Sequence, residues 1–333
     1  MIRAFSILQE TDLANYIDAV YIKTNFPLNG PVLRRLAKRK YDALHPYDTR
    51  LHKRFKASPA WENSMKKRYQ LTSRKPRRRR LVKNPPTDNE VHVFRQALKN
   101  RRLELGDNAV LNMDETVTKS VEAMRTVIGV KGTECRPVVI NGNDKQGVPA
   151  IVTVTASGSK LPTMFVAKGK TDASLKKLRL PQVALDAEGF PIGDGDIPVR
   201  TRSGWADHNI IEMWLHYVVL AYMRRTGKHR ICIVIDSASC HWYHTVVARA
   251  AAYGVELLKV PKGMTSSLQP LDVRINGSVK SGMRSLWMDA VVDDPLVARN
   301  VADAVRDFQT KFRETTSETI VSVFNSICDA KSK

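Results

Sequence analysis

A short alternation of apolar runs and amphipathic helices restricts the fold of this chain more than any other feature. The order is helix, strand, helix, strand over residues 205–227, 230–236, 243–254 and 255–260. Asp207 is the candidate N-cap of the first helix and Gly227 its candidate stop. Strands joined by a single helix are expected to be parallel neighbours that are covered on both faces. This part of the chain therefore predicts an α/β sheet.

Upstream of it, β-branched runs separated by Gly- and Asn-bearing turns indicate consecutive hairpin strands. These runs occupy residues 108–114, 136–140, 149–156 and 162–169. Residues 170–200 are expected to be irregular, a long helix is expected from about Val273, and the tail 295–330 is expected to be helical. Together the patterns predict a ribonuclease-H-like α/β domain with a mixed five-stranded sheet flanked by helices, preceded by a small all-α domain.

The charge of the chain is extreme and uneven. The net charge is +21, and residues 1–110 hold 25 Lys+Arg against 10 Asp+Glu, whereas residues 111–333 hold 29 against 23. A basic front ahead of a nearly balanced body favours a module that meets a polyanion. A general solubility role is the alternative. The longest apolar stretch, residues 213–223, is too short to span a bilayer, so no membrane partner is expected.

The basic front has the pattern of three short helices, over residues 8–24, 32–44 and 59–70, with Trp61 in their core. A Pro/Gly break separates the first two, which is typical of a helix-turn-helix module. We expect its DNA contacts, together with those of the basic segment that follows, from Arg34, Arg35, Lys38, Arg39, Lys40, Lys66, Lys67, Arg68, Arg74, Lys75, Arg77, Arg78, Arg79 and Arg80.

Residues 73–80 hold six Arg/Lys and are followed by Pro85 and Pro86, so we expect a solvated linker here. Its basic cluster can bind the phosphate backbone or act as a nuclear localisation signal. The expected divisions are a DNA-binding domain at 1–72, a basic linker at 73–105, the α/β domain at 106–295 and a helical tail at 296–333. The nucleus is the expected location.

Three acids occupy positions where the predicted topology brings chain segments together. Asp114 ends the first strand, Asp236 ends the strand 230–236, and Asp272 stands where a loop meets the long helix. Open α/β sheets bind ligands at the carboxyl ends of their strands. Three convergent carboxylates without His or Cys select Mg²⁺ or Mn²⁺, and two such ions suit an in-line phosphoryl displacement. The alternative for each acid taken singly is a turn former or helix cap.

Two neighbours are secondary candidates for the same site. Glu115 follows Asp114, but successive strand residues point to opposite faces. His241 can orient substrate or handle protons, or it can be a helix-entry residue that bonds the backbone.

The blocks "LNMDET", "IVIDSASCH" and "VPKGMTSSLQPLD" resemble the three acidic blocks of DDE superfamily endonucleases. More narrowly, they resemble the pogo, Tigger and jerky branch of mariner-like transposases, whose third acid is Asp. The front of the chain resembles the centromere-protein-B-type helix-turn-helix that precedes this domain in the family. The resemblance covers residues 8–290.

The resemblance implies that Asp114, Asp236 and Asp272 are both metal ligands and catalytic residues, with two Mg²⁺ or Mn²⁺ ions. It implies cleavage of duplex DNA and strand transfer by a transposase-derived protein, and a homodimer for the pairing of DNA ends. Two positions depart from the family pattern. Ser237 stands where Asn is usual, and Lys262, with the glycine after it, replaces Pro-Asn. Ser237 still offers a hydrogen bond, and Lys262 can contact phosphate.

Other functions stay open at this point. The first is a domesticated or decayed relative that binds DNA without nuclease activity. The second is a scaffold that uses its basic surface for partners. The third is a nuclease that acts on RNA or structured DNA.

Overall fold

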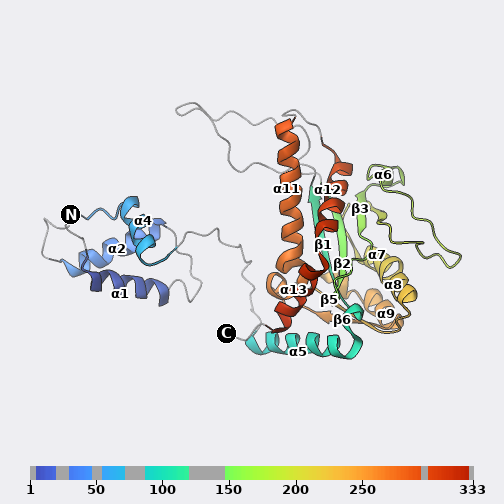
Figure 1. Cartoon of the computed structure of the whole chain (residues 1–333), viewed down its shortest axis with the longest axis horizontal. Coiled ribbons are helices and arrows are strands. Elements are labelled where there is room, and N and C mark those ends of the chain that lie inside the picture. Colours follow the sequence, from blue (N-terminus) through green and yellow to red (C-terminus); the bar gives the residue numbers. More distant parts are fainter. Residues whose placement is uncertain are drawn as a thin grey trace. The chain divides into compact units, whose positions relative to one another are not determined.

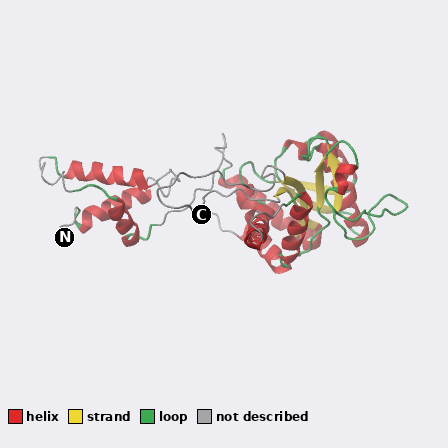
Figure 2. Cartoon of the chain, turned by 90° about the horizontal axis from the view of Figure 1, so that it is seen from above, coloured by secondary structure: helices red, strands yellow, loops and turns green. Residues whose placement is uncertain are grey.

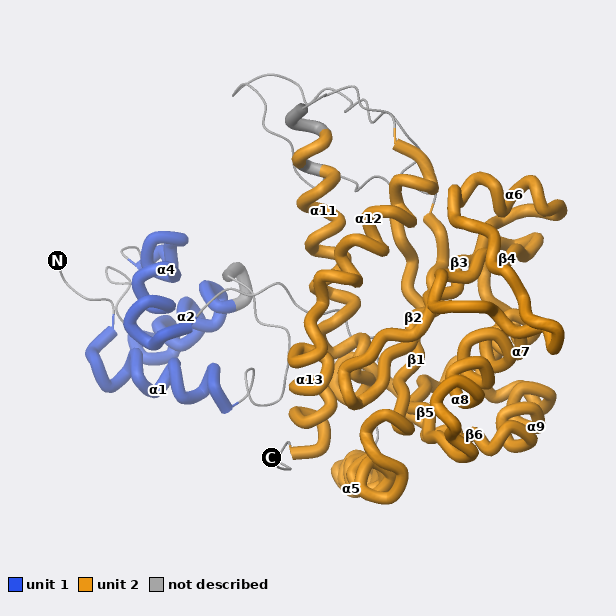
Figure 3. The backbone as a smooth tube through the Cα atoms, turned by 45° about the vertical axis from the view of Figure 1, so that its right-hand side comes forward, with its two compact units in different colours: residues 1–78 blue, residues 79–333 orange. Residues whose placement is uncertain are grey.

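The computed structural model describes residues 5–19, 30–46, 55–71, 87–119, 147–293 and 299–329. The chain divides into two compact units, residues 1–78 and residues 79–333, which Figure 3 distinguishes by colour. The basic residues 74–80 and the predicted strand 136–140 lie outside the described residues.

Unit 1 contains the three helices that the sequence predicts: α1 (Ile7–Ile17), α2 (Gly30–Leu44) and α4 (Pro59–Arg68). Ser6 and Ser58 cap α1 and α4 by accepting a hydrogen bond from a first-turn amide, which satisfies a donor that the helix leaves free. Apolar side chains of the three helices and of the segment before α4 form one core, with Leu13, Met65 and Phe55 among them. A small helical unit with its own core results.

Unit 2 is built on a six-stranded sheet in the order β4-β3-β2-β1-β5-β6. The strands are β1 (Val110–Lys119), β2 (Gly147–Thr155), β3 (Met164–Lys168), β4 (Ile197–Thr201), β5 (Ile231–Ile235) and β6 (Val255–Lys259). β2 runs antiparallel to β1 and β3, whereas β1, β5 and β6 are mutually parallel. The predicted mixed ribonuclease-H-like sheet is confirmed.

Helices cover both faces of this sheet, as Figures 1 and 2 show. On one face pack α5 (Asp88–Leu105), α11 (Asn276–Asp293), α12 (Val301–Glu314) and α13 (Ser317–Asp329). On the other pack α7 (His208–Trp214), α8 (Ala221–Thr226) and α9 (His244–Ala252), with a π-helical turn Leu215–Leu220 between the first two. The inner strands β2, β3 and β5 are therefore buried on both sides, which explains their nearly continuous apolar sequences.

The sheet has one strand more than the five predicted, because β4 lies in the segment expected to be irregular. It is a five-residue edge strand whose burial alternates only partly, and it contains Pro198. An edge position tolerates a proline, since one side of the strand has no partner that needs the missing N–H. A strand this short has no sequence pattern that separates it from a loop.

The predicted linker is wrong for residues 88–105, which form helix α5. Thr87 and Glu90 make a reciprocal capping box that starts this helix, and Val91, Phe94 and Leu98 bury its inner face in the core of unit 2. The expected separate tail is likewise part of the body, because α12 and α13 contribute side chains to the same core. No helix in the described ranges is long and apolar enough to cross a membrane.

Candidate active site

The register between β1 and β5 brings two of the predicted acids together. The two strands are parallel, and their last paired residues are Asn112 and Val234. Asp114 and Asp236 each lie two residues further along their strands, so they occupy equivalent positions. β1 itself continues to Lys119 along β2, so the expectation that Asp114 ends its strand is wrong. Asp114 instead stands just beyond the paired part of β1 and β5.

The third acid is positioned by the residues immediately before it. The Nδ2 amide of Asn112 donates to Val234 O at 2.9 Å, and its Oδ1 accepts from Leu271 N at 2.8 Å. The buried Gln269 donates from Nε2 to Met113 O at 3.2 Å. These hydrogen bonds attach the "QPLD" segment to β1, so Asp272, the second residue of the helical segment that begins at Leu271, lies beside Asp114.

Asp114 is buried and surrounded by acidic and amide groups. Asn276, one helical turn after Asp272, donates from Nδ2 to Asp114 Oδ2 at 2.6 Å. Burial raises the pKa of the Asp114 carboxyl well above its usual value, and a hydrogen bond and charge repulsion from Asp272 and repulsion from Asp236 raise it further. The charges of Asp236 and Asp272 therefore both act on the Asp114 carboxyl.

Asp236 is held from the other face of the sheet by a buried histidine. His241 Nδ1 lies 2.7 Å from Asp236 Oδ1, and His241 Nε2 lies 3.1 Å from Glu115 Oε1. Burial lowers the pKa of His241, but the bonds to Asp236, Cys240 and Glu115 outweigh that effect and raise the pKa to about 11. His241 is thus an imidazolium that bridges two carboxylates.

The pKa of Asp236 is affected by opposing causes. Burial raises it, whereas the bonds from His241 and from Ala238 N, at 2.9 Å to the same Oδ1 atom, bring it below its usual value. Asp236 is therefore ionised at neutral pH. Its Oδ2 atom has no hydrogen-bond partner within the described part of the chain.

The donor set fits a hard divalent cation. Asp114, Asp236 and Asp272 supply carboxylate oxygens only, and their mutual repulsion is relieved when a cation binds. Within the described residues, however, the group whose ligand atoms all lie within 4.8 Å of one another is Glu115, Cys240 and His241, and the three acids do not form such a group. Both ring nitrogens of His241 are already hydrogen-bonded to carboxylates, so the group around His241 is an ion-pair cluster rather than a metal site.

The secondary candidates divide between two arrangements. Glu115 and His241 form the ion pair described above, on the opposite face from Asp114. Ser237 and Lys262 have no hydrogen bond or ion pair within the described residues, and Lys262 is exposed. The supporting amides of Asn112, Gln269 and Asn276 were not predicted from the sequence. The Asn and Gln of "LNMD" and "QPLD" were the available signal, because buried amides next to an acid need defined partners.

Three of the cations predicted to bind DNA are paired within unit 1. Arg34 and Lys66 both contact Glu62, at 2.8 and 2.7 Å, and Arg68 pairs with Glu10. The Arg34–Glu62 pair joins α2 to α4 and the Arg68–Glu10 pair joins α4 to α1, whereas the Lys66–Glu62 pair lies within α4. Other predicted cations of the described helices have no ion pair within the described residues, namely Arg35, Lys38, Arg39, Lys40 and Lys67. The latter set remains the predicted DNA surface of unit 1.

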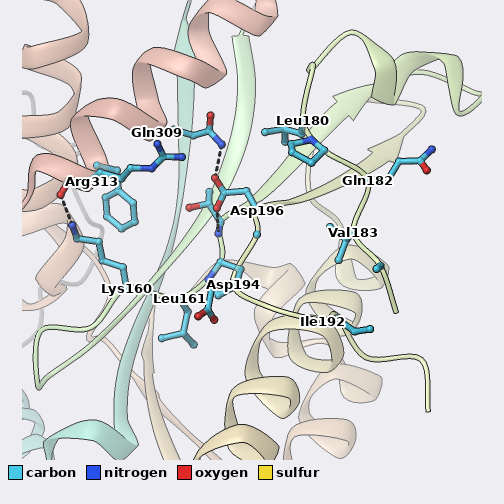
Figure 4. A pocket seen from close by; sticks show the side chains of 16 residues that line it. Lys160, Leu161, Leu180, Gln182, Val183, Ile192, Asp194, Asp196, Gln309 and Arg313 are labelled. Atoms are coloured by element: carbon cyan, nitrogen blue, oxygen red, sulfur yellow. Dashed lines mark hydrogen bonds between the residues drawn. The ribbon is translucent and has the colours of Figure 1, made fainter. Parts of the chain in front are cut away.

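A cavity of about 440 Å³ lies elsewhere in unit 2, between α12 and the loop before β4 (Figure 4). The Asp196 carboxylate accepts from Thr163 N and from Gln309 Nε2, each at 2.7 Å. Lys160 Nζ donates to Arg313 O at 2.8 Å. These polar groups are hydrogen-bonded to one another and hold α12 against the sheet. We therefore assign the residues around this cavity a structural role.

The sheet order, the helices on both faces and the converging acids define unit 2 as a ribonuclease-H-like domain. The chain belongs to the DDE superfamily endonuclease family, whose model matches residues 146–324. Residues 6–75 match the Tc5 transposase DNA-binding domain, at the position where the sequence predicts a helix-turn-helix DNA-binding module. Asp236 and Asp272 lie inside the endonuclease match, whereas Asp114 precedes it.

Two similar proteins are a mouse "Pogo transposable element with KRAB domain", 27% identical over 242 residues, and a human "Pogo transposable element with ZNF domain", 26% identical over 173 residues. The matches cover 71% and 50% of this chain but only 37% and 10% of those proteins. The fold is similar to the Mos1 strand transfer complex and to the Mos1 mariner paired end complex with Mn, each with TM-score 0.50 and 10% identity. These alignments cover 99% of this chain and 76% and 77% of the Mos1 chains. The likeness to Mos1 concerns the fold alone.

Proposed function

We propose that this transposase-derived protein binds duplex DNA through unit 1 and cleaves and joins DNA strands with Asp114, Asp236 and Asp272 as metal ligands and catalytic residues. The observation that carries the proposal is the β1–β5 register, which sets Asp114 and Asp236 at equivalent positions, together with the hydrogen bonds that attach the segment of Asp272 to β1. Two divalent ions, Mg²⁺ or Mn²⁺, would supply activation of the attacking oxygen and neutralisation of the leaving oxygen.

The residues around the acids prepare them for this chemistry. Asn276 orients Asp114 and fixes which of its oxygens is engaged. The His241 imidazolium and Ala238 N both bind Oδ1 of Asp236, which leaves its Oδ2 directed to other partners. Asp114 must lose its proton as a cation binds, since its pKa is raised in the cation-free protein. Preorganised carboxylates of this kind position charge before the phosphodiester arrives.

Cleavage of labelled DNA in Mg²⁺ or Mn²⁺ tests the proposal. Asp114→Asn, Asp236→Asn and Asp272→Asn should each reduce cleavage at least a hundredfold, because each removes one anionic ligand. Asp289→Asn, an exposed residue on α11, is the matched control and should cut like the unmodified protein. Equal cleavage by the site variants and the control would reject these acids as the catalytic centre. The appearance of strand-transfer products would distinguish a transposase from a general nuclease.

A protein that binds DNA without cutting it is the second candidate. Ser237 follows Asp236 where the family usually has Asn, and Oδ1 of Asp236 is committed to His241 and Ala238. Salt-dependent DNA binding with no cleavage in either metal would support this candidate.

Two further expectations are part of the proposal. We place the protein in the nucleus, on the basis of the basic segment 73–80, and expect a homodimer when DNA ends are paired. Imaging of a fluorescent fusion with and without Arg77–Arg80 tests the first expectation. Light scattering of the DNA complex tests the second.

A further inference from the structure

A wide groove in unit 2 has no role in the site described above. It has a volume of about 1230 Å³ and is lined by the ends of β1 and β3, the start of β2, the turn around α6 (Ala173–Lys176), the loop after β4 and the start of α12. Its charged lining residues are Lys119, Lys168, Lys176, Lys177 and Arg179, and among the described residues no carboxylate lines it. The groove therefore selects for an anion.

The five cations are free to meet a ligand. All five side chains are exposed, and none has an ion pair within the described ranges. By contrast, the nearby Arg200, on β4, is paired with Asp172 at 2.6 Å. Five neighbouring unpaired cations repel one another, and the binding of a polyanionic ligand relieves this repulsion.

An aromatic side chain stands in the same groove. Trp205 lines it and is 59% exposed. The turn that presents Trp205 is fixed by hydrogen bonds, because Thr201 Oγ1 donates to Trp205 O at 3.0 Å and accepts from Gly204 N at 2.8 Å. An exposed indole on a fixed turn offers a flat face for stacking.

Two glycines let the walls of the groove approach closely. A Cβ on Gly169 would lie 2.4 Å from Ser174 Cβ, so only glycine lets this turn pack against α6. A Cβ on Gly204, which has φ +78°, would lie 2.7 Å from Lys168 Cβ. Glycine at positions 169 and 204 thus permits the close packing that shapes the groove.

The groove lies along the same strand as the acidic site. Val117 and Lys119 of β1 line it from the face opposite to Asp114, and Val148 of the neighbouring β2 lines it from the face that Asp114 shares. At the rise of a β-strand, Val117 is roughly 10 Å from Asp114. A nucleic acid strand in the groove can therefore reach the three carboxylates within a few nucleotides.

We propose that this groove binds a single-stranded segment of DNA next to the cleavage site. Lys168, Lys177 and Arg179 contact its phosphates, and Trp205 stacks on an unpaired base. A base pair inside a duplex is stacked on both sides, so an unpaired base is the partner that an exposed indole face fits. The inference rests on the proposed function and adds the path of the DNA strand and the residues that hold it.

The test uses the full chain without divalent cation, so that no cleavage is required. The probe is an oligothymidylate single strand carrying 5-iododeoxyuridine, cross-linked by light and mapped by mass spectrometry. The expected cross-link is to Trp205. Trp205→Ala should weaken single-strand binding about tenfold and Trp205→Phe should retain most of it, because base–aromatic stacking tolerates a change of ring.

Charge is tested with a matched pair of substitutions. Lys177→Glu should reduce the salt dependence of binding, by about 0.7 in logarithmic slope for each phosphate that the protein no longer neutralises. Lys99→Glu makes the same change on α5, which Figure 1 places at the opposite end of unit 2 from α6, and should leave the slope unchanged. Cross-links confined to unit 1, or equal binding by Lys177→Glu and Lys99→Glu, would overturn the proposal.

Asp236→Asn separates this inference from the proposed function. If Asp236→Asn and the unmodified protein both fail to cut while the Trp205 cross-link persists, the groove stands and the nuclease function fails. If DNA is cut but Trp205→Ala binds and cuts like the unmodified protein, the function stands and the groove fails.

Discussion

Asn276 Nδ2 donates a 2.6 Å hydrogen bond to Oδ2 of Asp114, and through it helix α11 is joined to strand β1. Both residues are buried, so neither group can exchange this bond for one to water. Asn276→Ala should therefore lower the free energy of unfolding by about 1–3 kcal/mol, because a buried oxygen loses its partner. Urea unfolding measures the change. Asn209→Ala, at an exposed position of α7, is the control and should change stability little.

Stability without divalent cation should fall as pH rises above the ordinary pKa of Asp114. The folded state holds the Asp114 proton to a higher pH than the unfolded state, whose value is about 3.8. Between those two values the folded state binds more protons, so deprotonation favours unfolding. Asp114→Asn should remove this part of the pH dependence and raise the melting temperature at neutral pH.

Divalent cations should have the opposite effect at the same site. They bind the ionised carboxylates, so their stabilisation should increase with pH over the range in which Asp114 loses its proton. Melting curves in EDTA and in Mg²⁺ at several pH values test this. A stabilisation by Mg²⁺ that persists in the triple variant Asp114→Asn, Asp236→Asn and Asp272→Asn would contradict it.

His241 should stabilise unit 2 as a cation. Its folded pKa of about 11 exceeds the unfolded value of 6.5, so its contribution is complete below pH 6.5 and is lost as pH rises toward 11. His241→Gln should therefore be most destabilising at pH 6 and less so at pH 9. A difference in unfolding free energy that is independent of pH would show that His241 acts by packing alone.

The elements that a sequence pattern can predict are those with long or strongly apolar periodicity. The predicted strand 230–236 differs from the observed β5 by one residue at each end, and the helix with Asp207 as N-cap and Gly227 in the left-handed conformation also matches the structure closely. Edge strand β4 and helix α5 were missed, because a short edge strand resembles a loop and α5 follows directly on a proline-rich basic segment.

The three acids were found from their topological positions, but their supports were not. Which amide reaches Asp114 depends on the turn that joins "QPLD" to α11, and the His241 bridge depends on two segments 126 residues apart. Interactions of this kind arise from tertiary packing, on which the local pattern gives no information. The endonuclease family match begins after Asp114, so the β1–β5 register is what brings that residue into the site.

Arg34 and Arg35 are neighbours in sequence with different surroundings. Arg34 pairs with the mostly buried Glu62, whereas Arg35 is exposed and has no ion pair within the described residues. Arg34→Ala should destabilise unit 1 by about 1 kcal/mol, because Glu62 loses a charged partner. Arg35→Ala should leave stability unchanged and reduce the salt dependence of duplex binding by about 0.9 in slope, the effect of one phosphate left without its cation. The reverse assignment of the two effects would refute the predicted DNA surface.

Gly169 and Gly195 provide a matched test of close packing beside the groove. Neither has a left-handed backbone, so an added Cβ changes packing rather than backbone strain. At Gly169 the new Cβ would meet Ser174 Cβ at 2.4 Å and Oγ at 2.6 Å, whereas at Gly195 it meets no atom within 4 Å. Gly169→Ala should lower the free energy of unfolding by about 1–3 kcal/mol, since the buried Ser174 and the start of α6 must move. Gly195→Ala should be neutral or stabilising by about 0.4–1 kcal/mol, because it restricts the unfolded chain. If Gly169→Ala also weakens single-strand binding while Gly195→Ala does not, the position of α6 contributes directly to the groove.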